Sequence, residues 1–318
     1  MASTELVAVT RDTILWFVDS GAEGHLAVSL GSLRLAAPSV WRSTTKVVID
    51  CGLSSDMLAF LSAAASEGVH VVPAFKIWDE PWDPTSLGIL PMRMRIHAPR
   101  LLSRRLAGSF LPPASAYLVC DADTVFWHEF KIPTPGADSD LLIMQEWDNK
   151  TGVDVPMLLV RQSTFALPLE EVHLETISRA LGLPEDTLRT LPTYNTGVFT
   201  FVAGAGFTDA WHHDYQTIIA LRDHAGRRVF SPFAAEQNAL SVAIQRGTIS
   251  AGPLPRRFNQ FPPRPPRLWP AGTVIAHFVT FRRNYREARY AAWFEAQDAV
   301  RAEGWVPEPL LSVVQWPR

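Results

Sequence analysis

The stretch AYLVCDADTVFW at Ala116–Trp127 decides the expected fold. An apolar run at 117–120 ends in two acids, Asp121 and Asp123, and a second apolar run follows at once. Carboxylates between buried segments cost free energy unless a partner compensates their charge. A divalent cation such as Mn²⁺ or Mg²⁺ is one such partner, because it accepts hard oxygen ligands. A strand that ends in a solvated Asp-rich turn is the alternative interpretation.

Upstream of this stretch, short apolar runs alternate with helical patterns. Strands are expected at 13–19, 46–50 and 69–74, with helices at 25–36 and 54–67. This β-α-β-α-β order predicts an α/β fold with a mainly parallel sheet and helices on both faces. Ligands of such sheets bind beyond the carboxyl ends of the strands, where both Asp19 and Asp121 are placed.

Downstream, the same alternation continues without a repeat or a low-complexity linker. Further strands are expected at 140–146, 157–160, 194–202, 248–251 and 273–278. Further helices are expected at 93–106, 169–181, 208–223, 233–245 and 285–303. A Trp/Pro stretch at 77–91 and a Pro/Arg stretch at 255–268 are predicted loops of unassigned role. We expect one domain over 1–318, with a C-terminal helix and tail over 282–318.

The composition is that of a globular protein. The chain has 318 residues, of which 47% are hydrophobic and 19% charged, and its formal net charge is −3. No basic field is present to attract nucleic acid or anionic lipid. Cys51 and Cys120 adjoin apolar runs and are expected to be buried thiols in a reducing compartment. Because neither a signal peptide nor a membrane span is evident, a cytoplasmic protein is expected.

Polar residues also interrupt later apolar runs. Asn195 precedes Thr196 and Gly197, which by themselves indicate a turn or a bulge. Glu236 and Gln237 stand near a helix start, where an acid is favourable in any case. His277 lies inside an apolar strand, where a satisfied core histidine is the ordinary explanation. Their joint occurrence after the D-x-D pair favours a site.

These pieces carry a family resemblance. The segments are FVDSG, SLGSLRL, YLVCDADTVFW, YNTGVFTF, AEQNALS and IAHF. They resemble the nucleotide-sugar glycosyltransferases of the GT-A fold, in particular the glycogenin-like and lipopolysaccharide galactosyltransferase-like group, glycosyltransferase family 8. The resemblance implies a Rossmann-like mixed, mainly parallel sheet. It also implies transfer of a sugar from a nucleoside-diphosphate sugar, with a UDP-sugar as the expected donor, to an acceptor hydroxyl.

The resemblance further implies a ligand set and a donor site. Asp121, Asp123 and His277 would hold Mn²⁺ or Mg²⁺, and the nitrogen ligand favours Mn²⁺. Asp19 would contact the nucleotide base, and Arg100, with Arg104 as its alternative, would contact the donor. The donor would also lie against Ala122, Asn195, Thr196, Gly197 and Gln237.

For the reaction itself, the resemblance implies retention of configuration by front-face substitution. Gln237 would stabilise oxocarbenium character, Asn195 would face the donor sugar, and Glu236 is a candidate helper, although the family more often has Asp there. Glu146 and Asp148 could bind sugar hydroxyls, or one of them could act as the base of an inverting enzyme. A sugar nucleotidyltransferase is disfavoured, because SGAEGH at 20–25 has no Lys or Arg.

The acceptor stays open between a saccharide, a small molecule and a protein. The terminal helix carries an apolar face that includes Phe294 and Val300. This face could pack on the body of the protein or on a second copy, so a homodimer is an alternative to a monomer.

Overall fold

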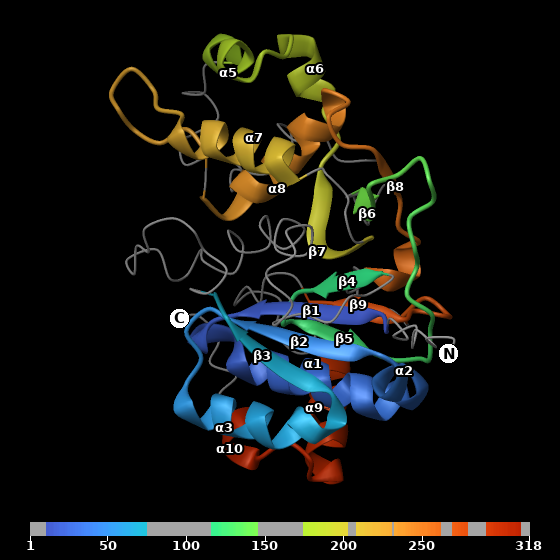
Figure 1. The fold of residues 1–318 in the computed structure, drawn as a ribbon. Coiled ribbons are helices and arrows are strands. Elements are labelled where there is room, and N and C mark those ends of the chain that lie inside the picture. The colour runs from blue at the N-terminus through green and yellow to red at the C-terminus, as the bar shows by residue number, and fades with distance from the viewer. Residues whose placement is uncertain are drawn as a thin grey trace, which may run out of the picture.

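A computed structural model describes residues 11–74, 116–145, 174–202, 208–230, 232–261, 269–278 and 291–312. In this part of the chain, a seven-stranded sheet has the order β3-β2-β1-β4-β7-β6-β8 (Figure 1). Its strands are β1 (Thr13–Val18), β2 (Thr45–Asp50), β3 (Val69–Pro73), β4 (Tyr117–Cys120), β6 (Leu141–Gln145), β7 (Tyr194–Phe201) and β8 (Ala251–Pro253). A second sheet pairs β5 (Thr124–Phe126) with β9 (Ile275–His277).

Helices surround the large sheet. They are α1 (Glu23–Ala36), α2 (Pro38–Ser43), α3 (Ser55–Ala63), α5 (Leu174–Leu181), α6 (Glu185–Thr190), α7 (Thr208–Ala220), α8 (Pro232–Gln245), α9 (Ala291–Glu303) and α10 (Glu308–Ser312). Short 3₁₀ turns are η1 (Ser20–Ala22), η2 (Ala64–Glu67) and η6 (Arg256–Phe258). Figure 1 shows α7 and α8 on one side of β1–β3, and α1, α3 and α9 on the other. The expected sheet with helices on both faces is therefore confirmed.

Alternate side chains of the strands belong to two separate cores. On β1, Leu15 and Phe17 lie in one core with Trp211 of α7. Ile14, Trp16 and Val18 lie in the other core, which α1, α3, α9 and α10 cover. Because successive strand residues point to opposite faces, a strand buried on both faces is a continuous apolar run, as TILWFV is.

The direction of β7 brings its first residues to the D-x-D pair. β1, β2, β3 and β4 are parallel, whereas β7 is antiparallel to both β4 and β6. The start of β7 therefore lies beside the carboxyl end of β4, where the Asp121 amide donates to the Gly197 carbonyl over 2.7 Å. The register against β6 shifts between Ile143 and Met144, whose partners are Phe199 and Asn195. This irregularity in the β6–β7 pairing falls at Asn195–Gly197, where the sequence by itself indicates a turn or a bulge.

Most predicted elements agree with the described ones to within a few residues. The strand expected at 248–251 is misplaced, since β8 begins only at Ala251. The Thr248 amide still donates to the Ala243 carbonyl, and Gly247 has φ +70°, so this stretch closes α8 instead. Neither α2 nor α6 was predicted, because six residues carry too little periodicity. The elements expected at 77–91, 93–106 and 157–160 lie outside the described residues.

Glu67, at the end of η2, joins three segments of the helical layer. Its carboxylate accepts from Trp41 Nε1 at 2.9 Å, Trp305 Nε1 at 2.8 Å and Arg34 Nε at 3.1 Å. Burial raises the pKa of Glu67, but these donors outweigh it and hold the pKa below its usual value. We call Glu67, Arg34, Trp41 and Trp305 the Glu67 cluster. It fastens α1, α2 and the segment before α10 to one another.

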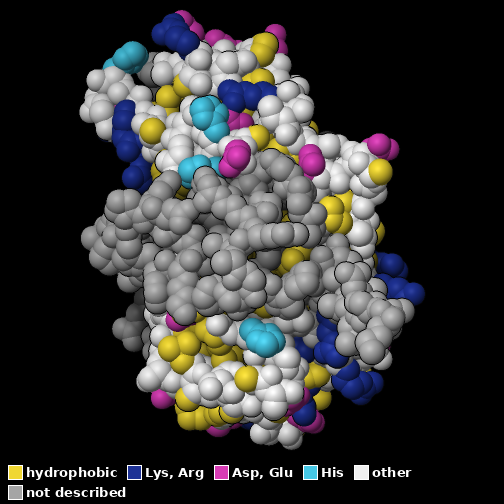
Figure 2. Space-filling model, viewed as in Figure 1, with side chains coloured by type: hydrophobic (Ala, Val, Ile, Leu, Met, Phe, Trp, Pro, Cys, Tyr) yellow, Lys and Arg dark blue, Asp and Glu magenta, His cyan; other side chains and the backbone are white. Residues whose placement is uncertain are grey.

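The surface carries charges of both signs. Figure 2 shows basic and acidic side chains intermixed around α5 to α7. Within the described ranges, no helix is both long enough and apolar enough to cross a bilayer. Cys51 and Cys120 are buried and form no disulfide, as expected. The single-domain organisation over 1–318 stays a prediction.

Candidate metal and donor site

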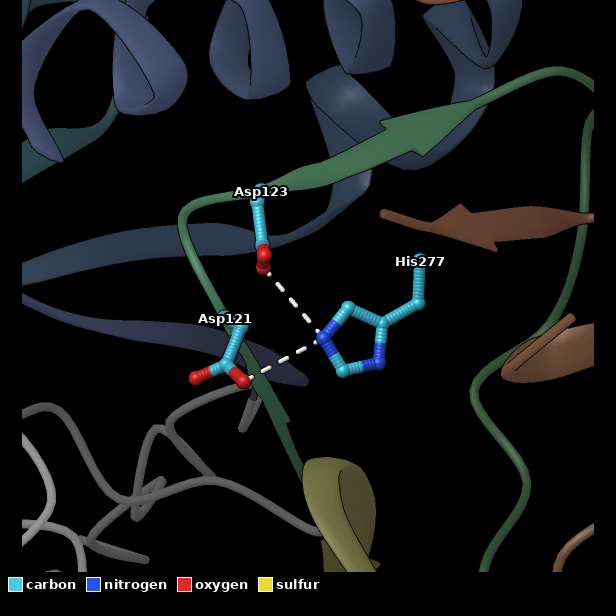
Figure 3. Close-up of side chains that lie close together, drawn as sticks. All are labelled: Asp121, Asp123 and His277. Atoms are coloured by element: carbon cyan, nitrogen blue, oxygen red, sulfur yellow. Dashed lines mark ion pairs between the residues drawn. The ribbon is translucent and has the colours of Figure 1, made fainter. Parts of the chain in front are cut away.

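Asp121, Asp123 and His277 converge at the end of β4. His277 Nε2 lies 3.3 Å from Asp121 Oδ2 and 3.3 Å from Asp123 Oδ1 (Figure 3). The imidazole is 2% exposed, whereas the two carboxylates are 25% and 24% exposed. One potential ligand atom of each residue lies within 4.8 Å of the other two. Two oxygens and a nitrogen therefore surround one point that solvent can reach from the side of the carboxylates.

Hydrogen bonds that start from α1 fix the turn that holds the two acids. Thr124 Oγ1 donates to the Asp121 carbonyl over 2.8 Å. Ser29 on α1 is 3.0 Å from Thr124 Oγ1, and it accepts from Trp16 Nε1 over 3.1 Å. These buried hydroxyls satisfy one another, so the turn costs little in unpaired polar groups. The acids are thus presented by a rigid turn.

His277 reaches the acids because β9 pairs with β5 directly after the turn. Thr124 and His277 are register partners in this small antiparallel sheet. On the other side of β9, the His277 amide donates to the Gln260 carbonyl over 2.9 Å. His277 Nδ1 lies 2.9 Å from Asn259 Oδ1. Backbone pairing on both edges and an amide contact together orient the ring.

Gly197 supplies the room for this ring. A Cβ at this position would lie 2.0 Å from His277 Cε1 and 2.6 Å from Asp121 Oδ2. Real Cβ contacts do not come this close, so any larger residue would displace the imidazole or the carboxylate. The glycine of the sequence YNTGVFTF is therefore needed for space at the site.

The three side chains perturb one another electrostatically. Burial disfavours a charged imidazole, but Asp123 and Asp121 outweigh burial and raise the pKa of His277 to about 9. Burial raises the pKa of Asp123, but His277 outweighs burial and holds this pKa below its usual value. A proton on Nε2 thus offsets one of the two carboxylate charges when no other cation does so. Because the ligand atoms are two hard oxygens and an imidazole nitrogen, the set also fits a divalent cation.

Comparison with known proteins identifies the architecture. No protein-family model and no curated protein sequence matches the chain. The bifunctional glycosyltransferase WbbM superposes with a TM-score of 0.57 and 10% identity over 92% of this chain, which spans only 50% of that structure. The galactosyltransferase LgtC, solved with donor and acceptor sugar analogues, gives a TM-score of 0.51 at 14% identity, covering 95% of this chain and 99% of LgtC. The chain has the GT-A fold. The fold implied by the sequence resemblance is therefore confirmed.

Several residues predicted for the donor site of the GT-A fold gather at the start of β7 and on α8. Asn195 is buried and its Oδ1 accepts from the Gly197 amide, and Ala122 is buried between the two acids in sequence. Thr196 Oγ1 donates to the Glu236 carboxylate, which is 2% exposed. Trp211 Nε1 also donates to the Glu236 carbonyl over 2.9 Å. Glu236 therefore ties α8 to β7, and Gln237 beside it is half-buried.

Asp19 lies at the end of β1, as the sequence predicts. Its Oδ1 accepts from the Gly21 amide over 3.0 Å and caps η1. Burial raises the pKa of its carboxyl. The remaining candidates, Arg100, Arg104, Glu146 and Asp148, lie outside the described residues.

Asn259 was missed by sequence reasoning. It lies in the Pro/Arg stretch at 255–268, which shows no periodic pattern. The structure places it after η6, with 0% exposure and beside His277. The one available signal was an asparagine directly after an aromatic residue, Phe258, in the stretch that precedes the strand of the predicted histidine ligand.

Proposed function

We propose that this protein is a metal-dependent glycosyltransferase that moves a sugar from a nucleoside-diphosphate sugar to an acceptor hydroxyl. The observation that carries the proposal is the convergence of Asp121, Asp123 and His277 at the strand ends of a GT-A fold. Two structures of similar fold are glycosyltransferases, and one of them was solved with donor and acceptor sugar analogues. We propose a UDP-sugar as the donor.

Asp121, Asp123 and His277 would hold Mn²⁺ or Mg²⁺, and the imidazole nitrogen favours Mn²⁺. When bound, such a cation neutralises the charge that develops on a diphosphate leaving group. The residues present fit this role, because their ligand atoms lie within 4.8 Å of one another and two of the three side chains are open to solvent. The buried imidazole supplies the rigid side of the site.

The other residues would bind and orient the donor. We propose that Asn195 and Gln237 lie along the donor sugar, with Ala122, Thr196 and Gly197 forming the floor beneath it. Asp19 would contact the base, and Arg100, or Arg104 in its place, would contact the donor. Glu236 already accepts a hydrogen bond from Thr196 in a buried position, which supports a role in fixing the β7 bulge. Retention follows if the leaving phosphate takes the acceptor proton on the same face of the sugar.

The test combines binding with turnover. Thermal unfolding would be followed with UDP-, GDP- and ADP-sugars, each with Mn²⁺ and with EDTA. We expect one nucleotide sugar to raise the melting temperature only when Mn²⁺ is present, because a ligand that binds the native state stabilises it. Hydrolysis of that donor should stop in EDTA and return with Mn²⁺. Donor binding and turnover that are equal in EDTA and in Mn²⁺ would refute the metal role.

A further inference from the structure

A relay of hydrogen bonds lies behind the candidate metal ligand His277. The Gly197 amide donates to Asn195 Oδ1 over 3.0 Å. Asn259 Nδ2 donates to the same Asn195 oxygen over 3.0 Å. Asn259 Oδ1 in turn lies 2.9 Å from His277 Nδ1. Gly197 is buried, and Asn195, Asn259 and His277 are 1%, 0% and 2% exposed.

One end of this relay has a fixed polarity. A backbone N–H can only donate, so the Asn195 atom that faces the Gly197 amide must be the amide oxygen. Since that oxygen can only accept, the Asn259 atom beside it must be the NH₂ group. The other end of Asn259 is then its oxygen, and this oxygen faces His277 Nδ1. The orientation of both asparagines thus follows from one backbone donor, and it does not depend on how amide atoms are assigned.

The relay determines which ring nitrogen of His277 carries hydrogen. A neutral imidazole has one N–H and one lone pair. A lone pair on Nδ1 would face the Asn259 oxygen at 2.9 Å, with two acceptors in contact and no proton between them. The hydrogen is therefore favoured on Nδ1. The lone pair is then on Nε2, the atom that lies 3.3 Å from each of Asp121 and Asp123.

We infer that Asn259, oriented by Asn195 and the Gly197 amide, is a positioning residue that holds His277 in the Nδ1–H form and directs its Nε2 lone pair to a cation between Asp121 and Asp123. The inference rests on the proposed metal site. It assigns Asn195 a role behind the ligand, in addition to the donor contact proposed for it. It also gives a function to a residue of the Pro/Arg stretch.

The first test is spectroscopic and needs no variant. The full-length protein, labelled with ¹⁵N-histidine, would be loaded with ¹¹³Cd²⁺ as a diamagnetic probe. We expect cadmium coupling to Nε2 of His277 and a directly bonded proton on Nδ1. Cadmium coupled to Nδ1, or a bound cation with the proton on Nε2, would overturn the inference. If wild-type protein binds neither Cd²⁺ nor Mn²⁺, the proposed function fails as well.

The second test measures affinity. Mn²⁺ titrations would compare wild type with Asn259→Leu, which keeps the branching of the side chain but removes both hydrogen bonds. Loss of such a supporting partner weakens metal binding by roughly 10–100-fold. Asn238→Leu is the matched control, because Asn238 is also a buried asparagine, on α8, and belongs to neither the ligand set nor the relay. A folded Asn259→Leu protein that binds Mn²⁺ as tightly as wild type would contradict the inference.

Discussion

Two charged clusters of this molecule use similar groups in opposite ways. In the Glu67 cluster, one carboxylate accepts hydrogen bonds from two indole N–H groups and one guanidinium N–H. At the D-x-D turn, two carboxylates face a single imidazole nitrogen at 3.3 Å. In these contacts, three N–H donors meet one carboxylate in the first cluster, whereas one imidazole nitrogen meets two carboxylates in the second.

The difference separates a structural cluster from a candidate ligand site. A carboxylate whose hydrogen-bonding capacity is met internally stabilises the fold and has little left to offer a ligand. Two carboxylates held together by a rigid turn repel one another unless a positive charge lies between them. We therefore expect substitutions in the Glu67 cluster to change stability, and substitutions at the D-x-D turn to change metal binding and turnover.

The largest effect is expected for Asp123→Ala. Removing one anionic ligand costs several kcal/mol of stabilisation at the leaving group, so transfer should fall by about 10³-fold or more. Steady-state donor hydrolysis with saturating Mn²⁺ measures this. Asp138→Ala, at an exposed position before β6, is the control and should keep wild-type activity. Full activity in Asp123→Ala would remove the turn from the mechanism.

The second largest effect is expected in the pH dependence of Mn²⁺ affinity. The pKa of His277 is raised from 6.5 to about 9, so its ion pair stabilises the metal-free fold fully below pH 6.5 and is lost as pH rises through 9. Cation binding runs the other way, because the Nε2 proton must leave first. Mn²⁺ affinity at pH 7 should therefore be roughly 100-fold weaker than above pH 9. Calorimetry in buffers of different ionisation enthalpy measures the released proton, and a flat profile with no proton release would contradict the expectation.

Gly197→Ala should act on both stability and the site. The new Cβ would lie 2.0 Å from His277 Cε1, and such overpacking costs about 2 kcal/mol. We expect a lower midpoint of urea unfolding together with weaker Mn²⁺ binding. Gly136→Ala is the matched control, because a Cβ there meets nothing within 4 Å. If Gly197→Ala leaves Mn²⁺ affinity unchanged, the ring does not depend on this space.

The smallest effect is expected for Glu67→Gln, and it should appear in stability alone. The amide keeps one acceptor but loses the ion pair with Arg34, whose side chain is 28% exposed, so the expected loss is about 1 kcal/mol. Chemical denaturation measures this loss, while Mn²⁺ affinity should match wild type. A large loss of metal affinity in this variant would mean that the two clusters are coupled.

Much of the fold could be predicted because buried strands are continuous apolar runs. Trp16 and Val48 lie in such runs, and β1, β2 and β3 were placed to within a residue. The convergence of His277 on the acids was predicted from the family order of motifs. Ser29 and Asn259 were not found, since a serine in a helix and an asparagine in a proline-rich stretch have many ordinary explanations. Only their contacts across the fold, to Thr124 and to His277, distinguish them.

The pairing of β5 with β9 has a consequence for biosynthesis. The acid pair leaves the ribosome long before His277, and β9, which carries this histidine, follows all seven strands of the large sheet in chain order. A nascent chain halted before β9 contains the acids without their nitrogen partner. If the proposed metal role holds, the complete ligand set forms only when β9 pairs with β5, so cation binding is expected to be acquired late in folding.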